Sequence, residues 1–193
     1  GLVLNQAKPK KNSIISVIGL GGIGMSALIA CKCVNTKKLI AIDINEKKLR
    51  EASKLGIKYL LNPLDKKFNT KYKEITENLG SDYIFESAGK SKTIELAFSL
   101  IKDSGSVYFA SHPNFDENIK LNPFELIKGK KIFGSWGGNY RPNRDLNKFL
   151  ILIKKNKINL DTLIPKTYKF EKINEAIKDL KQGKVIRAVL KFD

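Results

Sequence analysis

The chain has 193 residues, 42% of them hydrophobic and 28% charged, which is enough for one domain with a substantial core. It contains no apolar run of about 18 residues, so the sequence predicts no membrane-spanning helix. The net charge is +17, but only four of the 36 basic residues are arginines, the side chains that read bases and grip phosphates with two hydrogen bonds. We therefore interpret the charge as solvated lysine-rich faces and expect neither a nucleic-acid nor a membrane partner.

Short runs typical of strands alternate with amphipathic stretches typical of helices along the chain. In chain order, strands are expected at 13–18, 38–42, 58–61, 82–86, 105–110 and 131–135, with helices at 22–35, 46–55, 69–79, 91–102 and 143–155. Strict alternation favours a parallel sheet with helices on both faces, and the nearly all-apolar strands fit a sheet covered on both sides. The predicted fold class is α/β, a doubly wound parallel sheet of about six strands.

The end of the chain predicts one more helix and strand. The helix, 171–182, has Gly183 as its stop, and the strand covers 185–192. Residues 111–130 read as a long loop with one helical turn at "NPFEL" and a short β-like run at 116–121.

The two cysteines, Cys31 and Cys33, lie on the first predicted helix. Two positions apart, they point to different faces and cannot easily share a tetrahedral metal. Two cysteines form no disulfide framework, which favours a reducing compartment. We expect both thiols to be small apolar side chains in a cytoplasmic protein, and no metal site in this chain.

Four glycines gather where the first strand meets the first helix. Gly19, Gly21 and Gly24 form G-x-G-x-x-G, with Gly22 inside it, and Asp43 follows the next strand. A first glycine allows a tight turn, a second lets the backbone approach a pyrophosphate, and a third lets helix and strand pack closely. The free N–H groups of the helix N-terminus favour phosphates, and the acid can bind both ribose hydroxyls. The context predicts a dinucleotide-binding Rossmann fold.

Two other interpretations of the glycines remain open, and one is excluded. Met25 and Ser26 stand where a Walker-type triphosphate site needs lysine followed by serine or threonine. A methyltransferase with a glycine-rich first loop, or a fold whose ligand site is vestigial, fits the same pattern. Asp43 would repel a 2′-phosphate, which favours NAD over NADP, although Lys47, Lys48 and Arg50 could hold such a phosphate.

The chain resembles the cofactor-binding half of the zinc-dependent alcohol dehydrogenases, the medium-chain dehydrogenase/reductase family. The similarity runs in colinear order through "LNQAK", "VIGLGGIGMSALIACK", "IAIDINEKKLREASKLGIKYLLNP", "DYIFESAGK", "LNPFELIKGKKIFGSWGG" and "FEKINEAIKDLKQGKVIRAVLKF". It implies three parts: a linker-helix remnant at 1–12, an NAD-binding Rossmann domain at 13–140, and a segment at 141–193 that completes the domain and returns toward a missing catalytic domain.

The resemblance also implies which residues border the cofactor. They are Gly19, Gly21, Gly22, Ile23 and Gly24 at the first turn; Asp43, Ile44, Asn45 and Lys48 at the adenosine ribose; Ala88, Gly89 and Lys90 bordering the ribose on the far side of the fourth strand; Phe109, Ala110 and Ser111 in the nicotinamide pocket; Ser135 and Trp136 at the nicotinamide ribose; and Arg187 at the pyrophosphate. The family often has arginine where this chain has Lys90. A fork-shaped guanidinium suits phosphate oxygens, so the Arg187 assignment is also chemically sensible.

Zinc ligands are the important departure from the family. Members carry a catalytic zinc in a domain mainly on the amino-terminal side, and its cysteine and histidine ligands are not in this sequence, so we expect zinc only in that missing domain and no catalytic residue here. His112, the single histidine, follows the fifth strand. It is either a proton relay near the nicotinamide or an ordinary loop residue beside Pro113.

Two functions from different classes fit the sequence. The first is the NAD-binding domain of an alcohol or polyol dehydrogenase, inactive by itself; the second is a stand-alone nucleotide-sensing or assembly module without catalysis. The resemblance also implies a homodimer joined through an exposed sheet edge near 116–121 and 131–135. Lys128, Lys130 and Lys131 could instead protect that edge in a monomer.

Overall fold

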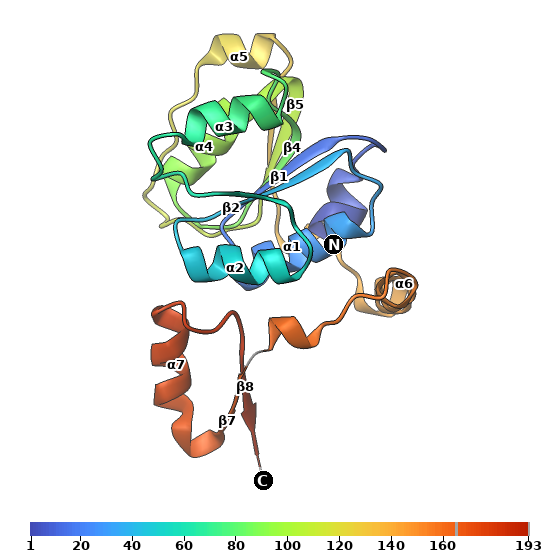
Figure 1. Cartoon of the computed structure of the whole chain (residues 1–193), viewed down its shortest axis with the longest axis vertical. Helices are drawn as coiled ribbons and strands as arrows, with labels where there is room; N and C mark the ends of the chain where they lie inside the picture. Colours follow the sequence, from blue (N-terminus) through green and yellow to red (C-terminus); the bar gives the residue numbers. More distant parts are fainter. Residues whose placement is uncertain (165, 193) are drawn as a thin grey trace.

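Six parallel strands form the central sheet, in the order β3-β2-β1-β4-β5-β6 (Figure 1). The structure, a computed structural model, describes residues 1–164 and 166–192. The strands are β1 (Ile14–Ile18), β2 (Lys38–Ile42), β3 (Tyr59–Leu61), β4 (Ser81–Glu86), β5 (Ile101–Phe109) and β6 (Lys131–Gly134). The chain starts in the middle of the sheet and winds outward to each side in turn, which confirms the predicted doubly wound α/β fold.

Helices cover both faces of the sheet and create two apolar cores. They are α1 (Gly22–Lys32) and α2 (Glu46–Lys54) on one face and α3 (Phe68–Ile75) and α4 (Ser91–Leu100) on the other. Two further helices, α5 (Pro123–Ile127) and α6 (Pro142–Lys155), contribute no residue to these cores. Alternate residues of β1 point into opposite cores, because successive side chains of a strand point to opposite faces of the sheet. Ile15 and Val17 pack with residues of α1 and α2, while Ile14 and Ile18 pack with residues of α3 and α4.

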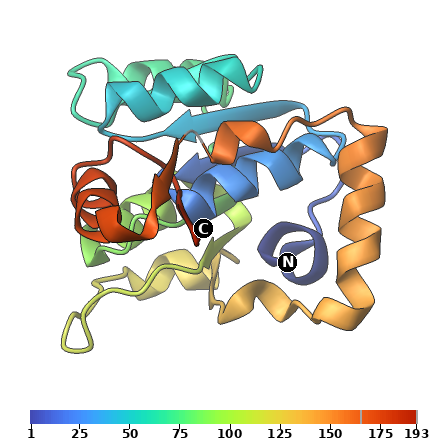
Figure 2. The same cartoon turned by 90° about the horizontal axis from the view of Figure 1, so that it is seen from below.

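The amino-terminal segment belongs to the first core. Residues Leu2–Ala7 form a short π-helix that ends where Lys8 adopts a left-handed conformation, so the predicted linker helix of 1–12 is helical over about half its length. Val3 is 1% exposed. Asn5 donates to the Asp145 carboxylate at 2.8 Å, which fixes this segment beside α6 (Figure 2).

Three predicted boundaries in the main sheet and its helices were wrong by three or four residues. The helix expected at 69–79 is α3, which ends at Ile75, because Glu77 and Asn78 adopt positive φ values of 57° and 63°. The first helix ends at Lys32 instead of residue 35, since the N–H groups of Cys33 and Val34 bond the carbonyls three residues earlier and tighten the last turn. Helix α4 passes directly into β5, which begins at Ile101, four residues before the predicted start. The pairing of β4 with β5 is irregular there, and Ser104 has a positive φ of 63°.

The last part of the chain does not extend the main sheet. Strands β7 (Lys166–Lys169) and β8 (Ala188–Lys191) pair with each other, and α7 (Ile173–Lys181) connects them. The predicted strand 185–192 is therefore shorter, and its partner β7 was not predicted. Figure 1 shows this β7–α7–β8 unit beside α2, outside the layers that cover the main sheet.

Strand β6 is one edge of the main sheet. The helical turn predicted at "NPFEL" is α5. The β-like run predicted at 116–121 is wrong, because within the described part of the chain these residues form a turn and extended backbone that pairs with no strand. Lys130 is 8% exposed and bonds the Glu125 carboxylate at 2.7 Å. Its ammonium is therefore not one of the charges that could guard the edge.

Candidate dinucleotide-binding site

Most of the predicted site residues lie at the carboxyl ends of the parallel strands. The chain leaves β1 for β2 on one side and reaches β4 on the other, so the order of the sheet reverses at β1. Loops that depart in opposite directions open a crevice at such a point, and ligands of doubly wound sheets bind there.

The glycine turn between β1 and α1 has a distinct steric requirement at each glycine. Gly19 has φ +83°, and a Cβ there would lie 2.6 Å from the Ala88 nitrogen. A Cβ on Gly24 would lie 1.8 Å from the Gly19 carbonyl oxygen, whereas one on Gly21 would meet no atom within 4 Å. Gly19 and Gly24 therefore allow the chain to pack against itself, and Gly21 faces open space where a ligand can approach the backbone.

The amino end of α1 has free hydrogen-bond donors. Gly21 is the N-cap residue, no side chain caps the helix, and the first intrahelical bond, from Met25 N to Gly21 O, is 2.9 Å long. The N–H groups of the first turn consequently point out of the helix with the positive end of its dipole, an arrangement that suits phosphate oxygens.

Asp43 connects the glycine turn to the end of β2. One carboxylate oxygen accepts from Leu20 N at 2.6 Å and the other from Asn45 N at 2.8 Å, and the residue is only 8% exposed. The Lys48 ammonium lies 3.8 Å away. Asn45 caps α2 by accepting from Lys47 N at 2.9 Å. The carboxylate is thus held in place before any ligand arrives, with lone pairs left for further donors.

Sequence reasoning missed two residues that fix the loops of the site, namely Glu86 at the end of β4 and Ser87 directly after it. Ser87 donates to the Gly19 carbonyl at 2.6 Å and so fastens the glycine turn from the other side. Glu86 is fully buried and accepts from Ala88 N at 2.8 Å and Gly89 N at 3.2 Å. A charged residue directly after the apolar run "YIF" (83–85) was the available signal, because glutamate is rarely buried without bound partners.

The ends of β5 and β6 lie together on the other side of the crevice. Ser135 N donates to the Phe109 carbonyl at 2.9 Å, and the Ser135 hydroxyl accepts from Gly138 N at 3.0 Å and donates to Gln6. Trp136 is 87% exposed, and its ring meets the His112 ring edge-on at 4.7 Å. The predicted residues 109–111 and 135–136 are therefore neighbours.

A cavity of about 700 Å³ adjoins the glycine turn. Three predicted site residues line it, namely Ile23, Ala110 and Arg187, together with residues that were not predicted, including Ser26, His112, Tyr140 and Phe149. Ile23 is 44% exposed despite its apolar side chain, because it faces this space. Its volume is within the range of small-molecule sites.

The segment before and within the last strand reaches back to the same crevice. Arg187 donates to the Gly22 carbonyl at 3.0 Å and to the Ser26 hydroxyl at 3.3 Å, so its guanidinium lies over the start of α1. A Cβ on Gly183 would lie 3.1 Å from the Asn45 amide nitrogen, which places this turn near the end of β2. Ile44 and Lys90 are exposed at the rim.

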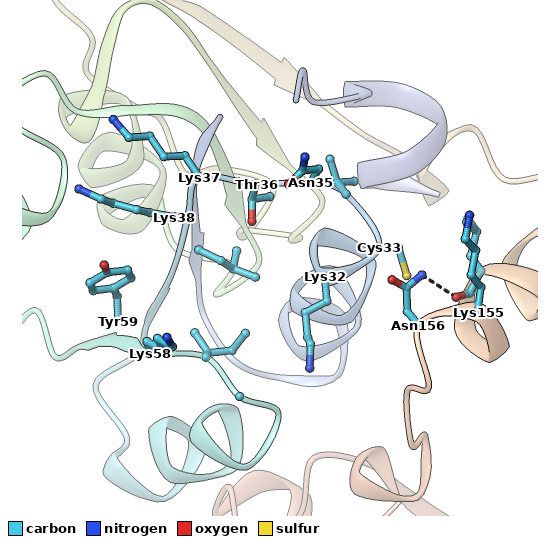
Figure 3. Close-up of a pocket in the computed structure, with 15 residues that line it drawn as sticks. Lys32, Cys33, Asn35, Thr36, Lys37, Lys38, Lys58, Tyr59, Lys155 and Asn156 are labelled. Carbon is cyan, nitrogen blue, oxygen red and sulfur yellow. Dashed lines mark hydrogen bonds between the residues drawn. The ribbon is translucent and has the colours of Figure 1, made fainter. Parts of the chain in front are cut away.

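At the opposite end of the sheet, a hollow of about 720 Å³ has five lysines and no acid in its lining. Figure 3 shows Lys37 and Lys38 side by side at the start of β2, whereas Lys32, Lys58 and Lys155 come from other segments and point elsewhere. Lys37 and Lys38 both bond Glu77, and Lys32 bonds the Leu55 carbonyl. The lysines form no convergent set of donors.

Within residues 1–164 and 166–192, no group of three histidine, cysteine, aspartate or glutamate side chains could hold a metal ion. Cys31 is buried and Cys33 half-buried, and burial raises the pKa of both thiols. Across the same residues, none of the helices has the length and apolarity needed to span a bilayer.

The family model described as "Zinc-binding dehydrogenase" matches residues 22–155. The chain belongs to this family. The alcohol dehydrogenase class-2 isozyme 2 of Oryctolagus cuniculus is 37% identical over 193 residues, covering 98% of this chain and 50% of the relative. The solved benzyl alcohol dehydrogenase of Acinetobacter calcoaceticus superposes with a TM-score of 0.93 at 26% identity, over 100% of this chain and 53% of the other.

This zinc-binding dehydrogenase chain therefore spans about half the length of the relatives it matches. A solved alcohol dehydrogenase of E. coli CFT073, described as complexed with cofactor NADH, shares the fold with a TM-score of 0.82 at 20% identity, over 96% of this chain and 54% of that one. The family predicted from sequence is confirmed. The matched region begins at the first residue of α1, just after Gly19 and Gly21, and contains the carboxyl end of β2 and the ends of β4 to β6.

Proposed function

We propose that this chain is the NAD(H)-binding part of a zinc-type alcohol or polyol dehydrogenase. The observation that carries the proposal is the glycine turn held against Asp43 at the point where the strand order reverses. Membership of the dehydrogenase family favours this function over a stand-alone nucleotide-sensing or assembly module.

In the proposed complex, different residues of the crevice contact different parts of the dinucleotide. The first turn of α1 and the Arg187 guanidinium hold the pyrophosphate by donated hydrogen bonds, and the open face at Gly21 lets it approach. Asp43 accepts from the adenosine ribose hydroxyls, with Ile44, Asn45 and Lys48 around it. The remaining predicted residues, Ala88, Gly89, Lys90, Phe109, Ala110, Ser111, Ser135 and Trp136, border the nicotinamide and its ribose.

The bound nicotinamide supplies hydride acceptance and donation, and this chain orients it. The apolar wall at Ile23 and Ala110 excludes water from one side of the cavity. Zinc does not fit the described residues, which offer no set of three ligands. We place the zinc and the alcohol pocket in a catalytic part of the enzyme outside this chain, which by itself oxidises no alcohol. The proposal places the enzyme in the reducing cytoplasm.

Asp43 gives the decisive test of the cofactor. In calorimetric titration the chain binds NADH more tightly than NADPH, because the carboxylate meets ribose hydroxyls but repels a 2′-phosphate. Asp43→Ser weakens NADH binding by roughly tenfold to a hundredfold, because a pair of charge-assisted hydrogen bonds is lost. The ratio of the NADH affinity to the NADPH affinity becomes smaller in this variant. Glu46→Gln, at the exposed first residue of α2, leaves both affinities unchanged. Absence of binding at millimolar NADH would overturn the proposal.

We also propose that two copies pair through the β6 edge. Phe133 on β6 is 40% exposed, and Phe124 and Ile127 of the neighbouring α5 are 58% and 79% exposed. In a two-fold dimer, β6 of one subunit pairs with β6 of the other, and this contact covers these side chains. Light scattering then gives twice the mass of one chain at high micromolar concentration. A mass that stays at 21.7 kDa excludes the dimer.

A further inference from the structure

Glu86 is a buried acid that the proposed cofactor contacts do not use. Its exposed fraction is 0%, and its carboxylate accepts four hydrogen bonds. Ala88 N, Gly89 N and the Thr93 hydroxyl approach Oε1, and the Ser111 hydroxyl approaches Oε2. The Thr93 hydroxyl shares its single proton between Oε1 and the Lys90 carbonyl oxygen, each at 2.8 Å. The two backbone N–H groups can only donate, so Oε1 accepts from both of them, and an ionised carboxylate would accept from all four partners.

All four partners of this carboxylate are neutral. Within the described residues, no lysine, arginine or histidine forms an ion pair with Glu86. Neutral donors compensate a buried charge only in part, and burial next to low-dielectric strands makes its field act strongly on nearby groups. A cation that binds close to Glu86 would be stabilised by that field.

The position of Glu86 identifies where such a cation would bind. Glu86 pairs with Phe109 in the sheet register, and its carbonyl accepts from Ala110 N at 3.1 Å. Its carboxylate connects the loop at 88–89 to Ser111, and these are the two segments that border the nicotinamide in the proposed function. One buried negative charge thus lies between the two walls of the nicotinamide pocket.

We propose that Glu86 is a positioning residue that orders both walls of the nicotinamide pocket and that its charge favours the oxidised cofactor. This inference rests on the proposed function. The oxidised nicotinamide ring carries a positive charge and the reduced ring is neutral, so a fixed anion stabilises the first and leaves the second unchanged. The balance between the two bound forms, and hence the potential of the bound cofactor, shifts toward NAD⁺.

The experiment measures the dissociation constants of NAD⁺ and NADH for the same preparation by calorimetry. Glu86→Gln has nearly the same shape but no charge, and it raises the ratio of the NAD⁺ constant to the NADH constant by about tenfold, the effect of one nearby charge in a screened site. A purely structural role would weaken both forms equally and leave the ratio unchanged. Glu74→Gln removes one exposed acid of α3 and leaves the ratio at the wild-type value.

Thr93→Val tests the same idea in the opposite direction. The substitution removes one compensating donor while the carboxylate stays, so its field at the cofactor strengthens and the ratio falls. This variant decides the question if Glu86→Gln does not fold. An unchanged ratio in the folded variants overturns the inference while the proposed function stands. Failure of the wild-type chain to bind either dinucleotide overturns both.

Discussion

The main sheet with its helices and the β7–α7–β8 unit are stabilised in different ways. In the sheet, Ile15, Val17 and Phe85 are all 0% exposed and belong to a core with residues of α1 and α2. In the unit, the tilted rings of Phe170 and Phe192 have centroids 4.8 Å apart but remain 45% and 75% exposed. A unit of this size has too much surface for its volume to form a core of its own.

Polar contacts hold the smaller unit together and connect it to the sheet. Asp179 accepts from the Tyr168 hydroxyl at 2.9 Å and pairs with Lys166 and Lys184 at 3.2 and 3.4 Å. Arg187 makes the bonds to the start of α1. Burial of apolar side chains therefore stabilises the main sheet, which forms the crevice. Hydrogen bonds and ion pairs hold the β7–α7–β8 unit in position next to it.

The largest expected effect is on the core of the sheet. Phe85→Ala lowers the free energy of unfolding by about 3–5 kcal/mol, because it leaves a cavity where the ring now packs. Phe192→Ala changes it by less than about 0.5 kcal/mol, since the ring is mostly exposed. Urea titrations followed by circular dichroism measure both. Equal losses would show that the two regions share one core.

The second-largest expected effect distinguishes a glycine that the fold requires from a glycine that cofactor binding requires. Gly24→Ala lowers the free energy of unfolding by roughly 1–3 kcal/mol, because the new methyl group meets the Gly19 carbonyl. Gly21→Ala adds a methyl group in open space, so stability stays within about 0.5 kcal/mol while NADH affinity falls. Thermal unfolding with and without NADH distinguishes the two. A Gly21→Ala variant with full NADH affinity would contradict the placement of the pyrophosphate.

Arg187 tests the connection between the two regions. Arg187→Gln weakens NADH binding by roughly tenfold, as expected for the loss of one charge-assisted hydrogen bond to phosphate, without a measurable change in the unfolding of the main sheet. Calorimetry and the urea titration provide the two values. Lys184→Gln, a charge of the same unit that bonds Asp179, is the control and keeps the NADH affinity. A loss in both variants would assign the effect to the unit as a whole.

Sequence patterns predicted the main sheet because each element is determined locally. The strands are apolar runs bounded by glycine or polar residues, and the glycine turn follows from spacing alone. Elements whose formation depends on packing between distant segments were not predicted correctly from local sequence patterns. The "KTYK" strand β7 has no apolar alternation and forms only because β8 pairs with it. The short run at 116–121 has strand-like residues but no partner strand.

Some residues of the candidate site were predicted from the sequence and others were not, for the same reason. Asp43 and the glycines are separated by one strand and one helix, so their meeting follows from the fold class. Gly183 comes close to Asn45 only through the placement of the β7–α7–β8 unit, which no local pattern specifies. The roles of Glu86 and Ser87 depend on hydrogen bonds across three loops and become visible only when β1, β4 and β5 are adjacent.

The smallest effect concerns the pH dependence of the smaller unit. The hydrogen bond from Tyr168, followed by the pair with Lys166, lowers the pKa of Asp179 below its usual value. A carboxyl group with a lowered pKa in the folded state contributes stability above the unfolded pKa of about 4, and that stability is lost as the pH falls through the folded pKa. Acidification from pH 6 to about pH 3 therefore loosens residues 166–191 as the contribution of Asp179 begins to be lost. Hydrogen exchange in this unit, corrected for its intrinsic pH dependence, should lose protection, and Asp179→Asn should already show the lower protection at pH 6. If protection in the variant still changes with pH as in the wild type, another group is responsible, and the directional bonds around Asp179 are not what holds the unit together.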